Sequence, residues 1–131
     1  MYRILAKEAL SPVTTLCVVG APEVARKAKA GQFIILRVTE RGERIPLTIA
    51  DYDRDAGTIT IVAQEVGKTT KLLAALSVGD SLASFTGPLG RPTEIERFGT
   101  VVVVGGGVGI APGYPICRSL LAAGNYVIGI I

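Results

Sequence analysis

The 131-residue chain contains no histidine, and this absence removes several kinds of chemistry at once. It excludes Ser-His and Cys-His nucleophile pairs, histidine-ligated metals and the usual general base. The two cysteines, Cys17 and Cys117, are too few for a zinc or four-thiolate iron–sulfur site, so no metal site is expected. Both are expected to be buried, reduced thiols. Any redox chemistry should therefore come from a bound cofactor.

Long apolar runs and dense charge are also scarce. No apolar run approaches the roughly 20 residues of a membrane-crossing helix, although 49% of the chain is hydrophobic. Charges near the N-terminus interrupt any signal peptide, which predicts a cytoplasmic protein without membrane insertion. The one dense basic cluster, Arg26, Lys27 and Lys29, is interpreted as a solvated turn. Four tyrosines and three phenylalanines give few stacking platforms, so we expect no nucleic-acid partner; an oligonucleotide-binding barrel is the alternative.

Residues 2–86 consist of short alternating or apolar runs separated by turn residues, the pattern of a small all-β barrel or sandwich. Leu72, Leu73 and Leu76 stand at helical spacing after Thr69 and Thr70, which predicts one short helix over residues 69–76 that closes an end of the barrel. Six antiparallel strands are predicted, at Tyr2–Ala9, Val13–Val19, Phe33–Val38, Ile45–Ile49, Thr58–Glu65 and Ser81–Thr86.

A different pattern follows the Gly/Pro-rich residues 87–92, where regular structure is expected to stop and the domain junction is placed. An apolar strand at residues 101–104 runs into glycines, and a helix over 115–123 and a second strand over 126–131 complete one parallel βαβ unit. We therefore predict a barrel domain at residues 1–97 and the start of an α/β nucleotide-binding domain at 98–131. This second domain is expected to be incomplete, either truncated or covered by a partner.

The glycine loop at residues 105–109 presents bare backbone N–H groups at a helix N-terminus, which suits a nucleotide pyrophosphate. The Gly-x-Gly-x-x-Gly/Ala fingerprint of Rossmann domains is absent, and a strand–helix turn without a ligand is the alternative. In the barrel, Pro46 lacks a backbone donor in mid-strand, leaving the nearby backbone and the Thr48 hydroxyl available to a ligand. The alternative there is an edge strand whose proline discourages aggregation.

Four segments, in this order and spacing, resemble the electron-transfer flavoprotein subunits of the ferredoxin-NADP reductase superfamily. They are Arg-Ile-Pro-Leu-Thr-Ile at 44–49, Gly-Lys-Thr-Thr-Lys-Leu at 67–72, Gly-Pro-Leu-Gly at 87–90 and Gly-Val-Gly-Ile-Ala-Pro at 107–112. The resemblance is greatest to the branch that contains the small subunits of NADH-dependent ferredoxin:NADP oxidoreductases, also called sulfide dehydrogenase β subunits. The electron-transfer subunits of type B dihydroorotate dehydrogenases are close relatives in the same branch.

The resemblance implies that the barrel binds FAD and that NAD(P)H is a substrate. The Thr48 hydroxyl then lies near flavin N5 as the catalytic group. Leu47 replaces a flavin-stacking tyrosine, so no aromatic stacking is expected there. Arg44, at the place of a pyrophosphate-binding arginine, stands one residue further from the hydroxyl than in the superfamily pattern. The implied cofactor-binding residues are Arg44, Ile45, Pro46, Leu47, Thr48, Val62, Ala63 and Gln64 for the flavin, Gly67, Thr69 and Thr70 for its pyrophosphate, and Gly107, Gly109, Ile110, Ala111 and Pro112 for the nicotinamide nucleotide.

The implied function is that of an NAD(P)H-dependent oxidoreductase subunit that passes electrons through FAD to an iron–sulfur partner or ferredoxin. A larger flavin and iron–sulfur subunit would complete a heterodimer. The family's cysteines for a two-iron two-sulfur cluster are absent from this sequence. The alternatives are the electron-transfer subunit of dihydroorotate dehydrogenase B and a truncated flavin-binding or assembly module without nicotinamide turnover. NADH and NADPH are not distinguished, because the discriminating residues normally follow the second strand of the nucleotide domain.

Overall fold

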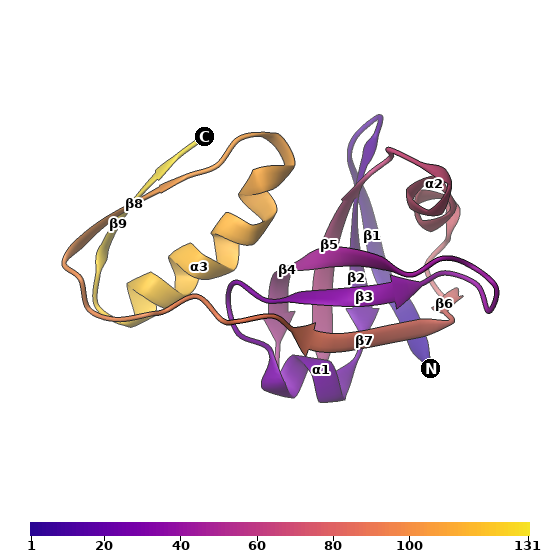
Figure 1. The fold of residues 1–131 in the computed structure, drawn as a ribbon, viewed down its shortest axis with the longest axis horizontal. Helices are drawn as coiled ribbons and strands as arrows, with labels where there is room; N and C mark the ends of the chain where they lie inside the picture. The colour runs from indigo at the N-terminus through magenta and orange to yellow at the C-terminus, as the bar shows by residue number, and fades with distance from the viewer.

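Seven strands form one closed antiparallel sheet in the computed structural model, which describes residues 1–131 (Figure 1). Their order is β6-β1-β2-β5-β4-β3-β7. Only Ala83 separates the two end strands, and its N–H donates to the carbonyl of Arg37 on β3 at 2.9 Å, so the sheet closes into a barrel. The strands are β1 (Tyr2–Ser11), β2 (Thr14–Gly20), β3 (Phe33–Arg37), β4 (Ile45–Asp53), β5 (Thr58–Gln64), β6 (Ser81–Leu82) and β7 (Ser84–Leu89). The predicted barrel is confirmed, although its expected sixth strand is two strands in the structure.

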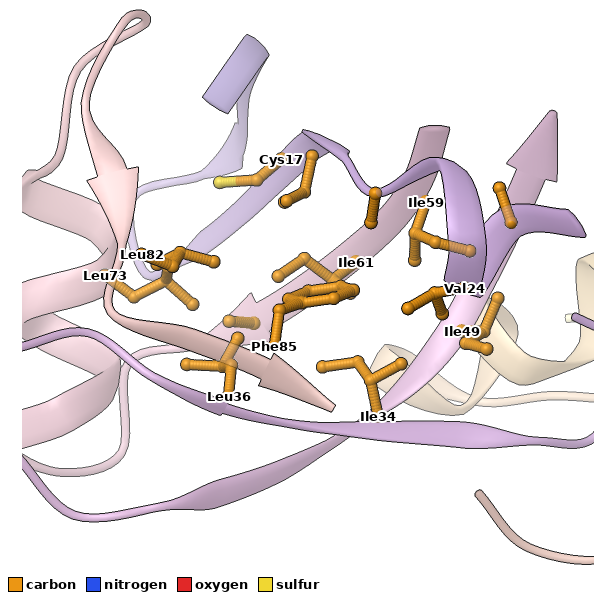
Figure 2. Close-up of a cluster of buried hydrophobic side chains, with 14 of the residues drawn as sticks. Cys17, Val24, Ile34, Leu36, Ile49, Ile59, Ile61, Leu73, Leu82 and Phe85 are labelled. Atoms are coloured by element: carbon orange, nitrogen blue, oxygen red, sulfur yellow. The ribbon is translucent and has the colours of Figure 1, made fainter. Parts of the chain in front are cut away.

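The barrel core is built by alternation along three strands. Every second residue of β2, β3 and β5 is buried, as the two-residue period of a half-exposed strand requires. These side chains meet inside the barrel, together with Leu73 from helix α2 (Lys68–Ala75), which confirms the predicted short helix (Figure 2). Fully buried members from the strands include Val19, Ile34, Leu36, Ile49, Ile59 and Ile61.

One short helix was not expected from the sequence. Helix α1 (Pro22–Lys27) follows β2 and buries Val24 and Ala25 in the barrel core. Arg26 and Lys27 are exposed, as expected, but they end this helix, so the interpretation of the basic cluster as a turn was wrong for these two residues. A six-residue helix with two buried positions shows no clear helical period.

Strand β7 continues past the point where the sequence predicted irregular structure. Gly87 and Pro88 lie within it, and Leu89 pairs with Phe33 of β3. The reason is a close approach of two strands: a Cβ at Gly87 would lie 2.6 Å from Cγ2 of Ile34, so only glycine fits there. Residues 90–99 then connect the barrel to the second unit without helix or strand.

The second unit is a βαβ arrangement, as predicted. Strands β8 (Thr100–Val104) and β9 (Tyr126–Ile130) pair in parallel, and helix α3 (Ile110–Ala122) lies between this sheet and the barrel (Figure 1). A single 3-10 turn (Gly107–Gly109) precedes α3, which begins five residues before the predicted start at Pro115. Pro112 fits the first turn of the helix, where the backbone donors have no partner within it, whereas Pro115 lies inside the helix. The outward sheet face leaves Val102, Val104, Tyr126, Ile128 and Ile130 exposed.

Asn125 fastens the second unit to the connecting segment. This side chain is 5% exposed, and its Oδ1 accepts from the N–H groups of Phe98 (2.6 Å) and Gly99 (2.9 Å). Its Nδ2 donates to the carbonyls of Glu96 (2.8 Å) and Leu120 (3.0 Å). All the hydrogen-bonding groups of the amide are thus used inside the protein. The structure contains no helix that is both long and apolar enough to span a bilayer.

Candidate cofactor site

The first half of β4 has one free edge. Residues 45–48 pair with β3 on one side, whereas β5 pairs with β4 only from Ile49 onward. Pro46 stands in this half and opposes Ile35 of β3. Backbone groups on the free edge of Ile45–Thr48 therefore have no neighbouring strand, which is the opening expected from a proline at this place. The edge-strand interpretation holds for this half of β4 alone.

A cavity of ≈ 300 Å³ lies against this strand and joins the two units of the protein. The barrel contributes one wall, and the glycine loop with the start of α3 contributes the other. Seven of its eight lining residues are among the site residues predicted from the sequence, Val108 being the exception. The barrel wall is Pro46, Leu47, Thr48 and Val62, and the opposite wall is Val108, Gly109, Ala111 and Pro112.

A second cavity of ≈ 760 Å³ adjoins the first and shares Val62, Val108 and Ala111 with it. Its lining is mostly apolar, with Asp51 and Gln64 among its few polar side chains. Volumes of this order are typical of sites for small molecules and cofactors. It also brings in three predicted residues that the smaller cavity lacks, Gln64, Gly107 and Ile110.

The N-terminus of α2 is the predicted pyrophosphate site. Thr70 uses its Oγ1 within the turn, accepting from the N–H groups of Val66 (2.9 Å) and Gly67 (3.0 Å) and donating to the Gly67 carbonyl. Thr69 donates its hydroxyl to Oε1 of Glu43 at 2.6 Å. Both threonines are buried. What this turn can offer an anion is therefore its backbone N–H groups, beside an exposed Gly67 where a Cβ would meet no atom within 4 Å.

Some predicted residues lie outside both cavities. Ala63 is 4% exposed and belongs to the barrel core, and Ile45 packs against the same core. Arg44 is exposed and lines neither cavity, nor do the α2 residues Gly67, Thr69 and Thr70. Glu43, by contrast, was not predicted, although it connects the start of β4 to the α2 turn.

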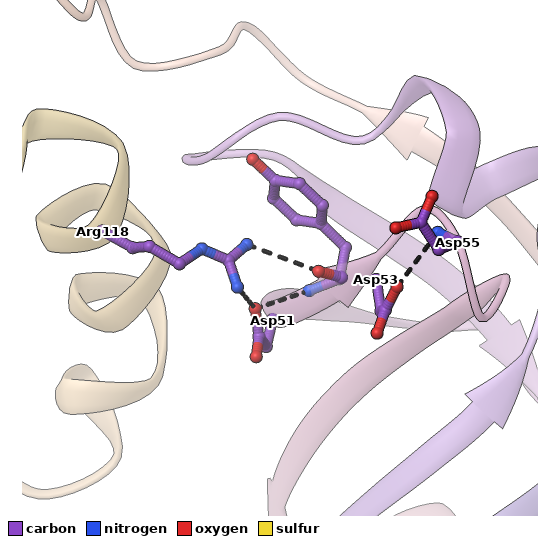
Figure 3. Close-up of polar contacts among 5 residues, drawn as sticks. Asp51, Asp53, Asp55 and Arg118 are labelled. Carbon is purple, nitrogen blue, oxygen red and sulfur yellow. Dashed lines mark hydrogen bonds and ion pairs between the residues drawn. The ribbon is translucent and has the colours of Figure 1, made fainter. Parts of the chain in front are cut away.

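Sequence reasoning also missed a polar contact between α3 and β4. Arg118 donates from Nη1 to the Asp51 carboxylate, and its Nη2 lies 3.4 Å from the carbonyl oxygen of Tyr52 (Figure 3). The guanidinium carbon is 4.8 Å from the Tyr52 ring centroid and 5.9 Å from that of Tyr114. Burial lowers the pKa of Arg118, but the contacts with Asp51 and Tyr52 raise that pKa by more than burial lowers it. The net shift of the pKa is upward, so the side chain stays charged.

A sequence signal for this contact does exist. Arg118 is the only charged residue of α3, in a helix of otherwise apolar and small residues. A lone charge on such a helix needs a partner or solvent, because burying an unpaired charge is costly. The partner could not be named from the sequence, since Asp51 is one of three acidic residues between positions 51 and 55.

Comparisons with known proteins agree with this architecture. No family model matches the chain. A protein of unassigned role from the adh 3′ region of Clostridium beijerinckii is 52% identical over 122 residues, covering 88% of this chain and 41% of the relative. The dihydroorotate dehydrogenase B (NAD(+)) electron transfer subunit homolog of Thermotoga maritima is 49% identical over 107 residues, with 82% and 38% covered. The corresponding electron transfer subunit of Desulforamulus reducens is 34% identical over 114 residues, with 84% and 43% covered.

Two solved structures extend the comparison. A structure of NADH-dependent reduced ferredoxin-NADP oxidoreductase, studied for flavin-based electron bifurcation, matches with a TM-score of 0.96 and 42% identity, covering 98% of this chain and 47% of that one. A cytochrome P450 reductase from Amycolatopsis matches with a TM-score of 0.79 and 26% identity, covering 98% and 41%. The chain thus spans less than half the length of each of these relatives.

A closed antiparallel barrel, followed by a βαβ unit whose glycine loop faces it across a cavity, defines a ferredoxin-NADP reductase-like fold. The chain has the fold of an FAD-binding domain of this kind: it is homologous to dihydroorotate dehydrogenase B electron transfer subunits and closely similar in structure to NADH-dependent reduced ferredoxin-NADP oxidoreductase.

Proposed function

We propose that the chain binds FAD in its barrel and works as the flavin-binding part of an NAD(P)H-dependent electron-transfer flavoprotein. The observation that supports this most is the cavity between Pro46–Thr48 and Gly109–Pro112. One wall comes from a strand with a free edge, and the other from a glycine loop that opens a helix. A redox cofactor and a nucleotide substrate need to meet across such a gap for transfer between them.

The residues present fit a flavin in chemical character. Leu47 and Val62 offer apolar contact to a planar ring, while the Thr48 hydroxyl and the free edge of β4 offer hydrogen bonds to its polar rim. The first turn of α2 offers backbone donors to a diphosphate. No aromatic side chain lines the smaller cavity, so the ring would be held by aliphatic contact and hydrogen bonds.

When bound, a flavin supplies hydride acceptance and release of electrons one or two at a time. The chain's own residues would orient it. In this proposal Thr48 is the catalytic group that hydrogen-bonds the reactive edge of the ring, and Val62 and Ala63 belong to the strand that supports it. Gly107–Pro112 would hold a nicotinamide nucleotide through the backbone N–H groups of the glycine loop. The proposed domains are residues 1–97 for FAD and 98–131 for the start of the nucleotide domain.

The proposed electron acceptor is an iron–sulfur partner or ferredoxin, with a larger flavin and iron–sulfur subunit completing a heterodimer. Support comes from what the relatives are: an electron transfer subunit of dihydroorotate dehydrogenase B and an NADH-dependent reduced ferredoxin-NADP oxidoreductase. The chain holds no group of three or more acidic, cysteine or histidine side chains arranged to bind a metal. The cluster would then belong to another segment or to the partner.

The second candidate function is the electron transfer subunit of a dihydroorotate dehydrogenase B. The relatives from T. maritima and D. reducens favour it, at 49% and 34% identity. A third reading, a flavin-binding or assembly module without nicotinamide turnover, is supported by the exposed apolar face of β8 and β9. The two-stranded sheet leaves that side of a nucleotide site unbuilt.

The visible absorption spectrum of the purified protein tests the proposal, recorded before and after NADH is added. We expect flavin absorbance that NADH bleaches. A flavin spectrum that NADH leaves unchanged would favour the module. A colourless protein that does not take up added FAD contradicts flavin binding altogether.

A further inference from the structure

Helix α3 and strand β4 carry the two walls of the smaller cavity, and one side chain connects them. Pro112 is in the first turn of α3, and Thr48 is in the first half of β4. Arg118 lies six residues after Pro112, about 9 Å along a helix. Asp51 lies three residues after Thr48, about 10 Å along a strand. The contact of Arg118 with Asp51 therefore lies at a similar distance from each wall, measured along the helix to Pro112 and along the strand to Thr48.

The local structure of β4 aims Asp51 and Tyr52 toward α3. The pairing of β4 with β5 shifts register between Ile49 and Asp51, which is a bulge. A bulge re-aims the side chains that follow it and is common beside functional sites. Oδ1 of Asp51 also accepts the N–H of Tyr52 at 2.8 Å, which fixes the carboxylate before Arg118 meets it.

The contact is more specific than an ordinary surface ion pair. A single guanidinium engages the Asp51 carboxylate and the Tyr52 carbonyl while its plane lies near two aromatic rings. Arginine suits this role because its fork of donors and its flat face act together. Arg118 and Asp51 remain 40% and 34% exposed, so salt should weaken the pair.

We propose that Arg118 is a positioning residue that clamps α3 to β4 and thereby sets the distance between the glycine loop and the Pro46–Thr48 strand. It touches neither cavity. Its role in electron transfer rests on the proposed function, since the clamp fixes how a nucleotide on the loop faces a flavin on the strand. Its role in holding the loop does not depend on that function.

The chain offers a matched control for this clamp. Arg54 also lies over the Tyr52 ring, at 5.1 Å from its centroid, but it bonds the carbonyl of Ala28 in the barrel. Arg54→Met therefore removes a cation from the same ring without touching α3. Arg118→Met removes the clamp, Arg118→Lys keeps the charge without the fork, and the Asp51→Arg/Arg118→Asp pair restores opposite charges in reversed order.

Hydrogen exchange of backbone amides, measured on the full chain without added FAD, gives the direct test. In Arg118→Met we expect exchange of residues 105–113 to rise about fivefold or more while the barrel strands keep their protection. The exchange of this loop in Arg118→Lys should lie between those of wild type and Arg118→Met. The charge-reversed double variant should recover the protection of the loop, and Arg54→Met should exchange as wild type does. Unchanged loop exchange in Arg118→Met, or an equal rise in Arg54→Met, would overturn the clamp.

Reduction of the bound FAD by NADH provides the functional reading of the same variants. We expect Arg118→Met to lower the rate at saturating NADH by about tenfold, with FAD affinity and photochemical reduction of the flavin unchanged. An unchanged rate would overturn the positioning role in transfer. A wild-type protein that NADH cannot reduce contradicts the proposed function instead, and the exchange measurement then decides the clamp by itself.

Discussion

Thr69 and Glu43 join the proposed phosphate turn to the start of β4, the proposed flavin-binding strand. The Thr69 hydroxyl, in the first turn of α2, donates to Oε1 of Glu43 at 2.6 Å, and Glu43 stands two residues before β4. The two stretches on which the proposed FAD binding depends, residues 45–48 and 67–70, are therefore neighbours in space. One dinucleotide could then contact the strand with its ring and the turn with its phosphates.

Glu43 also places a negative charge where a diphosphate is expected. Because the Glu43 carboxylate and a diphosphate at the same helix N-terminus repel each other, we expect Glu43→Gln to tighten FAD binding about threefold to fivefold. The glutamine can still accept from Thr69. Titration of the apoprotein with FAD, followed by quenching of flavin fluorescence, measures the change.

Glu40→Gln is the control for this variant. Glu40 lies in the same β3–β4 loop but pairs with Arg37 at 3.8 Å and is 84% exposed. It should leave FAD affinity unchanged. Weaker FAD binding in Glu43→Gln would mean that Glu43 contacts the bound cofactor favourably instead of competing with its phosphates.

Thr48→Val tests the proposed catalytic role of the Thr48 hydroxyl. The substitution keeps the volume of the side chain and removes the hydroxyl, so FAD should still bind. Reduction by NADH should slow by about tenfold, because one hydrogen bond to the reactive edge of the ring is lost. Stopped-flow absorbance of the bound flavin measures the rate.

Thr58→Val is the matched change at a position on β5 that lines neither cavity of the candidate site. Its reduction rate should equal that of wild type. If Thr48→Val is reduced as fast as Thr58→Val, the Thr48 hydroxyl has no part in the reaction.

Asn125 should be essential for the second unit and irrelevant to the barrel. Asn125→Ala leaves the N–H groups of Phe98 and Gly99 and the carbonyl of Glu96 without their partner, whereas the Leu120 carbonyl keeps the backbone N–H of residue 125 at 3.1 Å. We expect a loss of about 2–4 kcal/mol in the free energy of unfolding, measured by urea denaturation. The exposed neighbour variant Leu121→Gln should cost about 0.5 kcal/mol or less. Equal losses in the two variants would contradict the role of the Asn125 hydrogen bonds.

Because the Cys17 thiol is buried, we expect the free energy of unfolding to fall at alkaline pH. Burial raises the pKa of its thiol, and the charge of Lys7 offsets only part of this. A pKa raised by folding adds stability that is complete below the unfolded-state pKa, about 8.5, and is lost as the pH rises through the folded-state pKa. Between pH 8 and 10.5 wild type should therefore lose more unfolding free energy than Cys17→Ala. Cys117→Ala, on α3, should follow wild type; identical slopes for wild type and Cys17→Ala would contradict the account.

The parts of the fold that the sequence predicted are those with a local signal. Alternation in β2, β3 and β5 continues over five to seven residues, and the apolar run of β8 ends in glycines. Helix α1 escaped prediction because its six residues bury only Val24 and Ala25. The single residue Ala83 that divides β6 from β7 has no turn signature, and its position reflects closure of the barrel onto β3.

The candidate site also contains residues with a local sequence signal and contacts without one. Pro46, Thr48 and the loop residues Gly109–Pro112 were predictable, since proline in a strand and glycines before a helix have direct backbone consequences. The contacts of Glu43 with Thr69 and of Arg118 with Asp51 join residues 26 and 67 positions apart. Such pairs depend on how the barrel closes and where α3 docks, which no local pattern contains.

Hydrogen exchange with and without FAD tests the central claim most directly, because it reports where the cofactor lies regardless of turnover. We predict that FAD protects residues 45–49 and 67–71 together and leaves a separate cavity of ≈ 440 Å³, lined in part by Gly20–Glu23 and Phe85–Gly87, unchanged. Protection of that separate cavity, or of only one of the two predicted stretches, would contradict a flavin held along β4 with its phosphates at α2.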